Sequence, residues 1–131
     1  MQRFEPMVAV DVETKQEALR LFDKLSSDTD HQPIVKIGME LYYAFGPGIV
    51  REAKGRGLTV FLDLKLYDIP NTVERTMRVL GALGASFVTT HAAGGTEMMK
   101  AAKRGLLAGA TAVGRRQPKL LAVTKLTSID E

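Results

Sequence analysis

The sequence predicts an α/β fold of parallel strands that alternate with helices, corresponding to the N-terminal half of a (β/α)8 TIM barrel. Short runs rich in β-branched residues alternate with longer amphipathic segments, which is the pattern of βαβ units. These units have similar lengths, and four to five of them fill the 131 residues, whereas a complete barrel takes about 250. We therefore expect a single domain over residues 1–131 that holds the first four to five βα units, with the C-terminal half of the barrel absent.

The composition limits where such a protein works and what it binds. The chain has 45% hydrophobic residues and no cysteine, so it can build a core but neither a disulfide framework nor a thiolate metal site. The stretch up to Val12 holds no apolar run long enough for a signal peptide, and no window approaches the length of a membrane span. We expect a cytoplasmic protein that does not contact membranes.

One stretch of the chain is strongly basic. It contains Lys100, Lys103, Arg104, Arg115, Arg116 and Lys119, with Glu97 as the acidic residue among them. No aromatic residues are interleaved with these charges and no nucleic-acid-binding motif accompanies them. We interpret the stretch as a solvated helix face followed by a basic loop, and we expect no nucleic-acid partner.

The first half of the chain is expected to form three strands and two helices. The strands lie at residues 8–12, Ile34–Gly38 and Thr59–Leu66. The first helix begins with a capping box of Thr14 and Glu17. Its apolar stripe consists of Ala18, Leu21, Phe22 and Leu25. Residues 42–47 are expected to break the chain before the second helix, which carries Ile49, Val50 and Ala53 and ends in the glycine-rich residues 55–57.

The second half is expected to add two helices and two strands. Pro70 suits the first turn of a helix, whose apolar face is made by Val73, Met77 and Leu80 before Gly81 and Gly84. The strand Phe87–His91 follows. Another helix covers about residues 96–105, with Met98 and Met99 as core residues, and the last strand covers residues 120–126.

Charged residues in the expected strands indicate the functional site, because the C-terminal ends of barrel strands share one mouth. Asp63 and Lys65 are two residues apart and share one face, while the leucines at 62, 64 and 66 take the opposite face toward the helices. We expect the charged face to line the barrel interior. Buried charges need partners, so Lys36 and Lys65 are each expected near an aspartate.

Other interpretations of these residues are less favoured. A Lys and Asp pair two apart can also form a solvent-facing salt bridge on an edge strand, but the rest of this strand is apolar and helices are expected on both sides of it. His91 is expected to be a supporting histidine with its hydrogen bonds satisfied rather than a catalytic base. His31 is interpreted as an ordinary loop residue.

Residues 61–72, with the sequence FLDLKLYDIPNT, resemble the D-x-K-x-x-D-I-P-x-T signature of the orotidine 5′-monophosphate decarboxylase family. Four further segments support the resemblance in the order and approximate spacing of that family: VAVD ending at Asp11, VKIGMEL around Lys36, THAAGG around His91, and LAVTKLTS around Thr127. The resemblance implies decarboxylation of orotidine 5′-monophosphate to UMP in pyrimidine synthesis. It also implies that the reaction uses no metal and no cofactor.

The resemblance assigns a role to each matching residue. Lys65 would stabilise a carbanion at C6 of the pyrimidine and protonate it, with Asp63, Lys36 and Asp68 completing the catalytic set. Asp11 and Lys36 would bind the ribose hydroxyls, and Thr127 would lie near the pyrimidine or its carboxylate. The protein would be a homodimer with shared active sites, because Asp68, Ile69 and Thr72 would reach the site of the partner subunit. The family's phosphate-binding residues lie in the C-terminal half.

Two other functions remain open at this point. A Mg²⁺-dependent sugar-phosphate decarboxylase or aldolase of the same suprafamily shares a D-x-K-x-x-D strand, but those relatives usually place a glutamate ligand where this chain has Lys36, and a cation there opposes metal binding. Alternatively, the half chain is a non-catalytic fragment that binds a phosphosugar or dimerises. The missing phosphate site favours this second alternative, and the charged residues at 11, 36, 63 and 65 oppose it.

Overall fold

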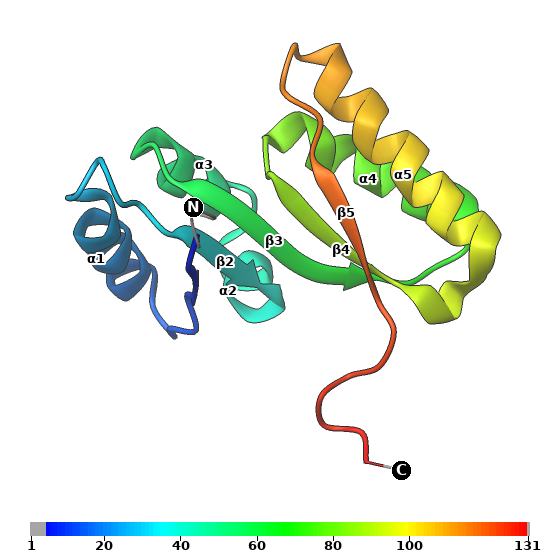
Figure 1. Ribbon diagram of the computed structural model, residues 1–131, viewed down its shortest axis with the longest axis horizontal. Helices are drawn as coiled ribbons and strands as arrows, with labels where there is room; N and C mark the ends of the chain where they lie inside the picture. The colour runs from blue at the N-terminus through cyan, green and yellow to red at the C-terminus, as the bar shows by residue number, and fades with distance from the viewer. Residues whose placement is uncertain (1–4, 131) are drawn as a thin grey trace. The chain divides into compact units, whose positions relative to one another are not determined.

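The computed structural model describes residues 5–130, which form two compact units that meet in the sequence between Asp63 and Leu64. Residues 1–4, which begin the stretch where no signal peptide is expected, lie outside the described residues, as does residue 131. Each unit is built from parallel strands and the helices that follow them (Figure 1).

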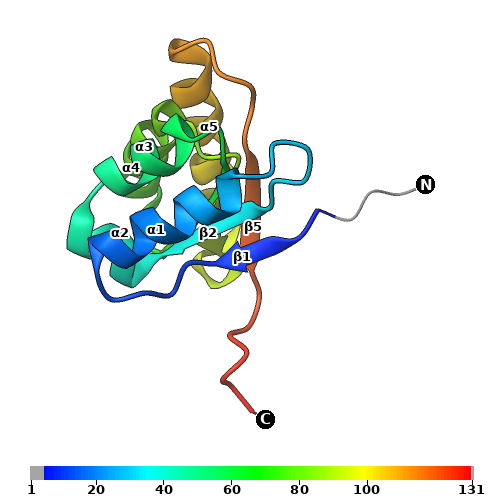
Figure 2. The same ribbon diagram turned by 90° about the vertical axis from the view of Figure 1, so that its left-hand side faces the viewer.

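The first unit contains strands β1 (Met7–Ala9), β2 (Ile34–Gly38) and most of β3 (Thr59–Leu66), with helices α1 (Lys15–Ser26), α2 (Met39–Phe45) and α3 (Gly48–Gly55). β2 pairs in parallel with β1 on one side and with β3 on the other. α1 packs against α3, and α2 packs against both α3 and β2. Figure 2 shows α1, β1 and β2 from the side. The core of this unit includes Phe22, Val35, Ile37, Ile49 and Val60.

The capping box expected at the start of the first helix is present. The Glu17 backbone N–H donates to Thr14 Oγ1 at 3.2 Å, and the Thr14 backbone N–H donates to Glu17 Oε2 at 3.0 Å. The hydrogen bond from the Thr14 hydroxyl is the main cause that lowers the pKa of the Glu17 carboxyl below its usual value. α1 is thus fixed at its N-terminal end by local contacts.

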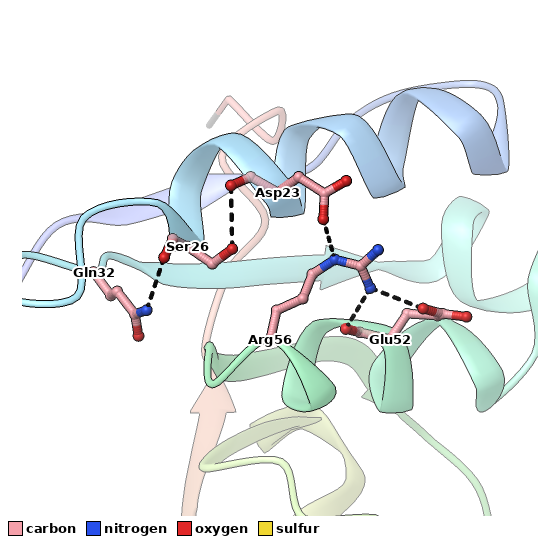
Figure 3. Close-up of polar contacts among 5 residues, drawn as sticks. All are labelled: Asp23, Ser26, Gln32, Glu52 and Arg56. Carbon is pink, nitrogen blue, oxygen red and sulfur yellow. Dashed lines mark hydrogen bonds and ion pairs between the residues drawn. The ribbon is translucent and has the colours of Figure 1, made fainter.

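Arg56 links the C-terminal half of α1 to the end of α3 (Figure 3). Its Nε donates to Asp23 Oδ1 at 2.5 Å, and its Nη1 donates to the Glu52 carbonyl at 2.9 Å and to Glu52 Oε2 at 2.8 Å. Ser26 Oγ donates to the Asp23 carbonyl, and Gln32 Nε2 donates to the Ser26 carbonyl. The bond to Asp23 is the main cause that raises the pKa of the Arg56 guanidinium. This network holds the chain just before it enters β3.

The second unit contains the last residues of β3 with α4 (Pro70–Leu83), β4 (Phe87–His91), the 3₁₀ turn η1 (Ala92–Gly94), α5 (Gly95–Ala112) and β5 (Lys119–Val123). β4 and β5 pair in parallel, with Val88 opposite Leu120. α4 and α5 lie side by side in close contact (Figure 1). Glycines make this contact possible, since a Cβ at Gly105 would overlap the backbone oxygen of Glu74 and one at Gly109 would overlap that of Arg78.

Much of the expected secondary structure is confirmed. The bounds of β2, β3 and β4 agree with the expected strands, and Val73, Met77 and Leu80 are buried on one face of α4. Met98 is a core residue as expected, and Met99 is partly exposed. The basic residues of α5 and of the loop after it are exposed, as interpreted from the sequence.

Several boundaries differ from those expected. Residues 42–47 were expected to break the chain, but most of them belong to a short helix, α2, whose Leu41 is buried in the core. The helix ends at Gly46, which has a φ of 68°. α5 continues past residue 105 to Ala112, since Gly105 serves contact with α4 rather than helix termination. α4 likewise includes Gly81. β1 ends at Ala9 and β5 at Val123, so both are shorter than expected.

Candidate active site

The side chains of β3 alternate between two environments, as the sequence indicates. Val60, Leu62 and Leu64 are buried on one face of the strand. The other face carries Asp63, which is nearly buried, and Lys65, which is partly exposed. The apolar face supplies the packing that fixes the strand, and the opposite face is left to carry the charges.

Lys36 and Asp63 form an ion pair across neighbouring strands. Lys36 Nζ lies 3.6 Å from Asp63 Oδ2, and the two side chains are 29% and 12% exposed. The register of β2 and β3 explains this geometry, because Gly38 stands opposite Asp63 and Lys36 lies two residues before Gly38 on the same face. A Cβ at Gly38 would itself meet open space. The expected proximity of Lys36 to an aspartate is therefore observed.

Lys65 has an unusual backbone conformation. Its φ is 49°, and among residues 5–130 it is the single non-glycine residue with a positive φ. Its N–H donates to the side-chain Oγ1 of Thr89 at 2.9 Å. No property of the sequence pattern indicated this conformation, and Thr89 was not among the expected site residues.

Asp68, Ile69 and Thr72 lie where β3 leads into α4, and all three are exposed. Asp68 Oδ1 accepts a hydrogen bond from the Ile69 N–H at 2.7 Å, and the Ile69 carbonyl accepts one from the N–H of Val73 at 3.1 Å. Ile69 occupies the N-cap position with extended backbone, and Pro70 begins the helix. The apolar side chain of Ile69 is therefore 66% exposed and lies next to the Asp68 carboxylate.

The remaining expected site residues follow the ends of other strands. Asp11 is exposed and comes directly after Val10, whose N–H donates to the Lys36 carbonyl at 2.9 Å, so Asp11 leaves the sheet beside β2. Thr127 is exposed in the turn after β5. The ring of His91 contacts the ring of Tyr67 edge to face at 5.7 Å between centroids, a contact that the sequence did not indicate. His31 is an exposed loop residue paired with Asp28.

A sizeable groove lies away from these residues. A groove of about 690 Å³ runs between α5 and β5, and its lining includes Met99, Lys103, Leu106, Leu107 and Leu120. Lys36, Asp63 and Lys65 do not line it. Within residues 5–130, no three His, Asp or Glu side chains gather in a group suited to a metal ion, and no helix has the length and apolar character needed to span a bilayer.

Comparison with known proteins identifies one family. A model of the family described as orotidine 5′-phosphate decarboxylase / HUMPS matches residues 5–131. A protein of Lactiplantibacillus plantarum named orotidine 5′-phosphate decarboxylase is 55% identical over 125 residues, covering 95% of this chain and 52% of that protein. A protein of the same name from Lactococcus lactis subsp. lactis is 53% identical over 131 residues, covering 100% and 54%. The chain spans about half the length of the curated relatives it matches, in their N-terminal part.

Solved structures give the same result. An orotidine 5′-phosphate decarboxylase from Lactobacillus acidophilus superposes with a TM-score of 0.87 at 44% identity, covering 96% of this chain and 55% of that one. An uncharacterized conserved protein from Geobacillus kaustophilus superposes with a TM-score of 0.86 at 52% identity, covering 95% and 56%. The α/β class expected from the sequence, with parallel strands alternating with helices, is confirmed, and it corresponds to about half of each of these structures.

Proposed function

This chain belongs to the orotidine 5′-phosphate decarboxylase / HUMPS family, and from that premise we propose that a protein of the relatives' length that begins with this sequence converts orotidine 5′-monophosphate to UMP and CO₂. The observation that carries the proposal is the ion pair between Lys36 on β2 and Asp63 on β3. Lys65, whose φ is positive, follows Asp63 by two residues. Relatives that are 50–55% identical to this chain bear the name of this activity.

The proposed chemistry depends on a fixed positive charge. Decarboxylation breaks the bond between C6 of the pyrimidine and the carboxylate carbon, and the electron pair stays on C6 in the plane of the ring. The π system cannot delocalise that pair well, so a nearby cation must stabilise it. The Lys65 ammonium serves as this cation and then transfers a proton to C6, after which the neutral amine regains a proton from solvent.

Asp63 is proposed to lie beside the substrate carboxylate. Two negative charges held close raise the free energy of the bound substrate, and the departure of neutral CO₂ relieves the repulsion. Unit charges about 4 Å apart interact by about 4 kcal/mol at an effective dielectric constant of about 20, which is part of a barrier and not the whole of it. The Lys36 ammonium, 3.6 Å from Asp63, offsets the cost of keeping this nearly buried carboxylate ionised.

The other site residues are proposed to bind and enclose the substrate. Asp11 and Lys36 would bind the ribose hydroxyls, and Thr127 would contact the pyrimidine or its carboxylate. The residues that hold the phosphate would come from the part of the relatives that this chain does not cover. As the sequence led us to expect, the reaction would need no metal and no cofactor, and the enzyme would be cytoplasmic.

We further propose that the enzyme is a homodimer with shared active sites. Asp68, Ile69 and Thr72 are exposed around the start of α4, and Ile69 presents a large apolar side chain to solvent. An exposed apolar residue next to a carboxylate suits a segment that inserts into a neighbouring subunit. In the dimer, these three residues would complete the substrate site of the partner.

The two alternative functions are less well supported. A Mg²⁺-dependent sugar-phosphate enzyme of the same suprafamily would need oxygen ligands near the charged strands, whereas the group that faces Asp63 is the Lys36 ammonium. A purely binding or dimerising fragment would not require an ion pair on a nearly buried strand carboxylate, because burying that charge costs desolvation. Each alternative differs from the proposed function in the outcome that it predicts for one assay.

The assay follows conversion of orotidine 5′-monophosphate to UMP by a chain of the relatives' length that begins with this sequence, with and without a chelator. Turnover that is unchanged by the chelator supports the proposal. Turnover that is lost on chelation and restored by Mg²⁺ would favour the metal-dependent alternative. The 131-residue chain by itself lacks the expected phosphate-binding residues, and we expect it to show little or no turnover.

A further inference from the structure

Lys65 adopts a backbone conformation that L-amino acids with long side chains rarely take. A φ of 49° brings its Cβ close to the neighbouring carbonyl, and the right-handed and extended regions are both more stable. Such a conformation persists only where the surrounding structure holds it in place. Lys65 lies near the end of β3, and most other residues of that strand could be assigned from a regular alternating pattern.

Two consecutive threonines of β4 bond to the backbone of β3, one at Lys65 and the other at the next residue. The N–H of Lys65 donates to Thr89 Oγ1 at 2.9 Å, and Thr90 Oγ1 donates to the Leu66 carbonyl at 2.8 Å. Both threonines are buried, with Thr89 only 3% exposed. A side-chain hydroxyl therefore accepts the bond from the Lys65 amide, so the path of β3 at this residue depends on a particular side chain of the neighbouring strand.

We propose that Thr89 is a positioning residue for Lys65, and this inference rests on the proposed function. The direction of the Cα–Cβ bond of Lys65 is set by its backbone, and that direction determines where a flexible four-carbon side chain can place its ammonium group. Stabilisation of a developing anion requires the cation at a fixed position, and a displacement of about 1 Å can cost about a hundredfold in rate. Thr89 fixes the amide that begins this turn of the backbone, without itself touching the substrate.

Thr90 provides a matched control within the same strand. It is the next residue, it is equally buried, and its hydroxyl also bonds to the backbone at the end of β3. Successive residues of a strand point to opposite faces, so Thr90 lies on the face opposite to Thr89. If the two threonines only stabilise the fold, replacing either by valine should have the same consequences.

The experiment compares Thr89→Val, Thr89→Ser and Thr90→Val in a chain of the relatives' length, by kcat, KM and melting temperature. We expect Thr89→Val to lower kcat by about tenfold or more with a change in KM below about threefold. Thr89→Ser, which keeps the acceptor, should stay within about threefold of wild type. Thr90→Val should lower the melting temperature about as much as Thr89→Val and leave kcat within about threefold of wild type. Equal losses of kcat in the two valine variants, or a loss in Thr89→Ser as large as in Thr89→Val, would overturn the proposal.

A second measurement does not depend on activity. Hydrogen exchange of the Lys65 amide should become faster in Thr89→Val and stay slow in Thr89→Ser and Thr90→Val, and unchanged exchange in Thr89→Val would overturn the proposal. If the wild-type protein has no decarboxylase activity, the proposed function fails while this measurement still tests the contact. Should Thr89→Val not fold, Thr89→Ala removes the same acceptor and is subject to the same expectations.

Discussion

The ammonium of Lys36 on β2 faces the carboxylate of Asp63 on β3 at 3.6 Å. The pair joins the middle of one strand to the charged face of the next, and it is the contact in the first unit that most directly links fold and proposed chemistry. Its partial burial distinguishes it from an exposed pair such as Lys100 with Glu97, because charges that are less hydrated interact more strongly and are costlier to leave without a partner.

Removal of the lysine from this pair should be costly for stability. We predict that Lys36→Met lowers the free energy of unfolding by about 1–2 kcal/mol, because it removes the ammonium that faces a nearly buried carboxylate. Urea denaturation measures this change. Lys100→Met is the control, since Lys100 Nζ lies at a similar 3.5 Å from Glu97 Oε1 but both side chains are largely exposed. The control should change stability by less than about 0.5 kcal/mol, and equal effects would show that burial of the pair is unimportant.

The capping box predicts a pH dependence of stability. The pKa of Glu17 is lowered in the folded protein, chiefly by the Thr14 hydroxyl. The ionised Glu17 carboxylate therefore stabilises the fold fully above the ordinary glutamate pKa of 4.5, and this stabilisation is lost as the pH falls through the lowered pKa. Melting temperatures between neutral pH and about pH 3 should fall less steeply at the acid end for Glu17→Gln than for wild type. Glu13→Gln is the control, and an equal change in that variant would contradict the role of the cap.

The contact between α4 and α5 should not tolerate a side chain at Gly105. A Cβ there would overlap the Glu74 backbone oxygen, so we predict that Gly105→Ala destabilises the fold by about 1–3 kcal/mol despite the higher helix propensity of alanine. Gly55, at the end of α3, has open space around its Cα. Gly55→Ala should be neutral or stabilising, and a Gly105→Ala variant as stable as wild type would mean that the two helices can separate without cost.

The shared-site dimer predicts complementation between two inactive chains. We expect Asp68→Ala and Lys65→Ala chains of the relatives' length to recover activity when they are mixed and allowed to exchange subunits. Random pairing makes about half of the dimers mixed, and each mixed dimer holds one site with both residues intact, so recovery should approach about a quarter of wild type. Absence of recovery, in a sample in which mixed dimers are shown to form, would contradict the shared site.

The sequence predicted β2 and β3, which carry the ion pair, better than the helices around them. Thr59–Leu66 was assigned correctly because alternating apolar and charged residues specify both a strand and its faces, and the ion pair of Lys36 with Asp63 followed from the need to partner buried charges. Gly105 was taken as a helix end because a glycine has the same local signature whether it terminates a helix or admits a neighbouring one. Only the tertiary contact with α4 distinguishes the two.

The backbone of Lys65 could not be predicted for a similar reason. Its positive φ is opposed by the local preference of lysine and is accompanied by a hydrogen bond to Thr89, which lies far away in the sequence. Local sequence patterns indicate the backbone conformation that each residue prefers. Residues at functional positions can depart from that conformation where contacts from other parts of the fold stabilise a different one.

The most direct test of the central claim is the decarboxylation rate of Lys65→Ala in a chain of the relatives' length, measured together with its melting temperature. The lysine is proposed to supply both the charge that stabilises C6 and the proton that C6 receives, so we predict that turnover is abolished while the melting temperature stays close to that of wild type. Retention of more than a few per cent of wild-type turnover by the folded variant would contradict the account.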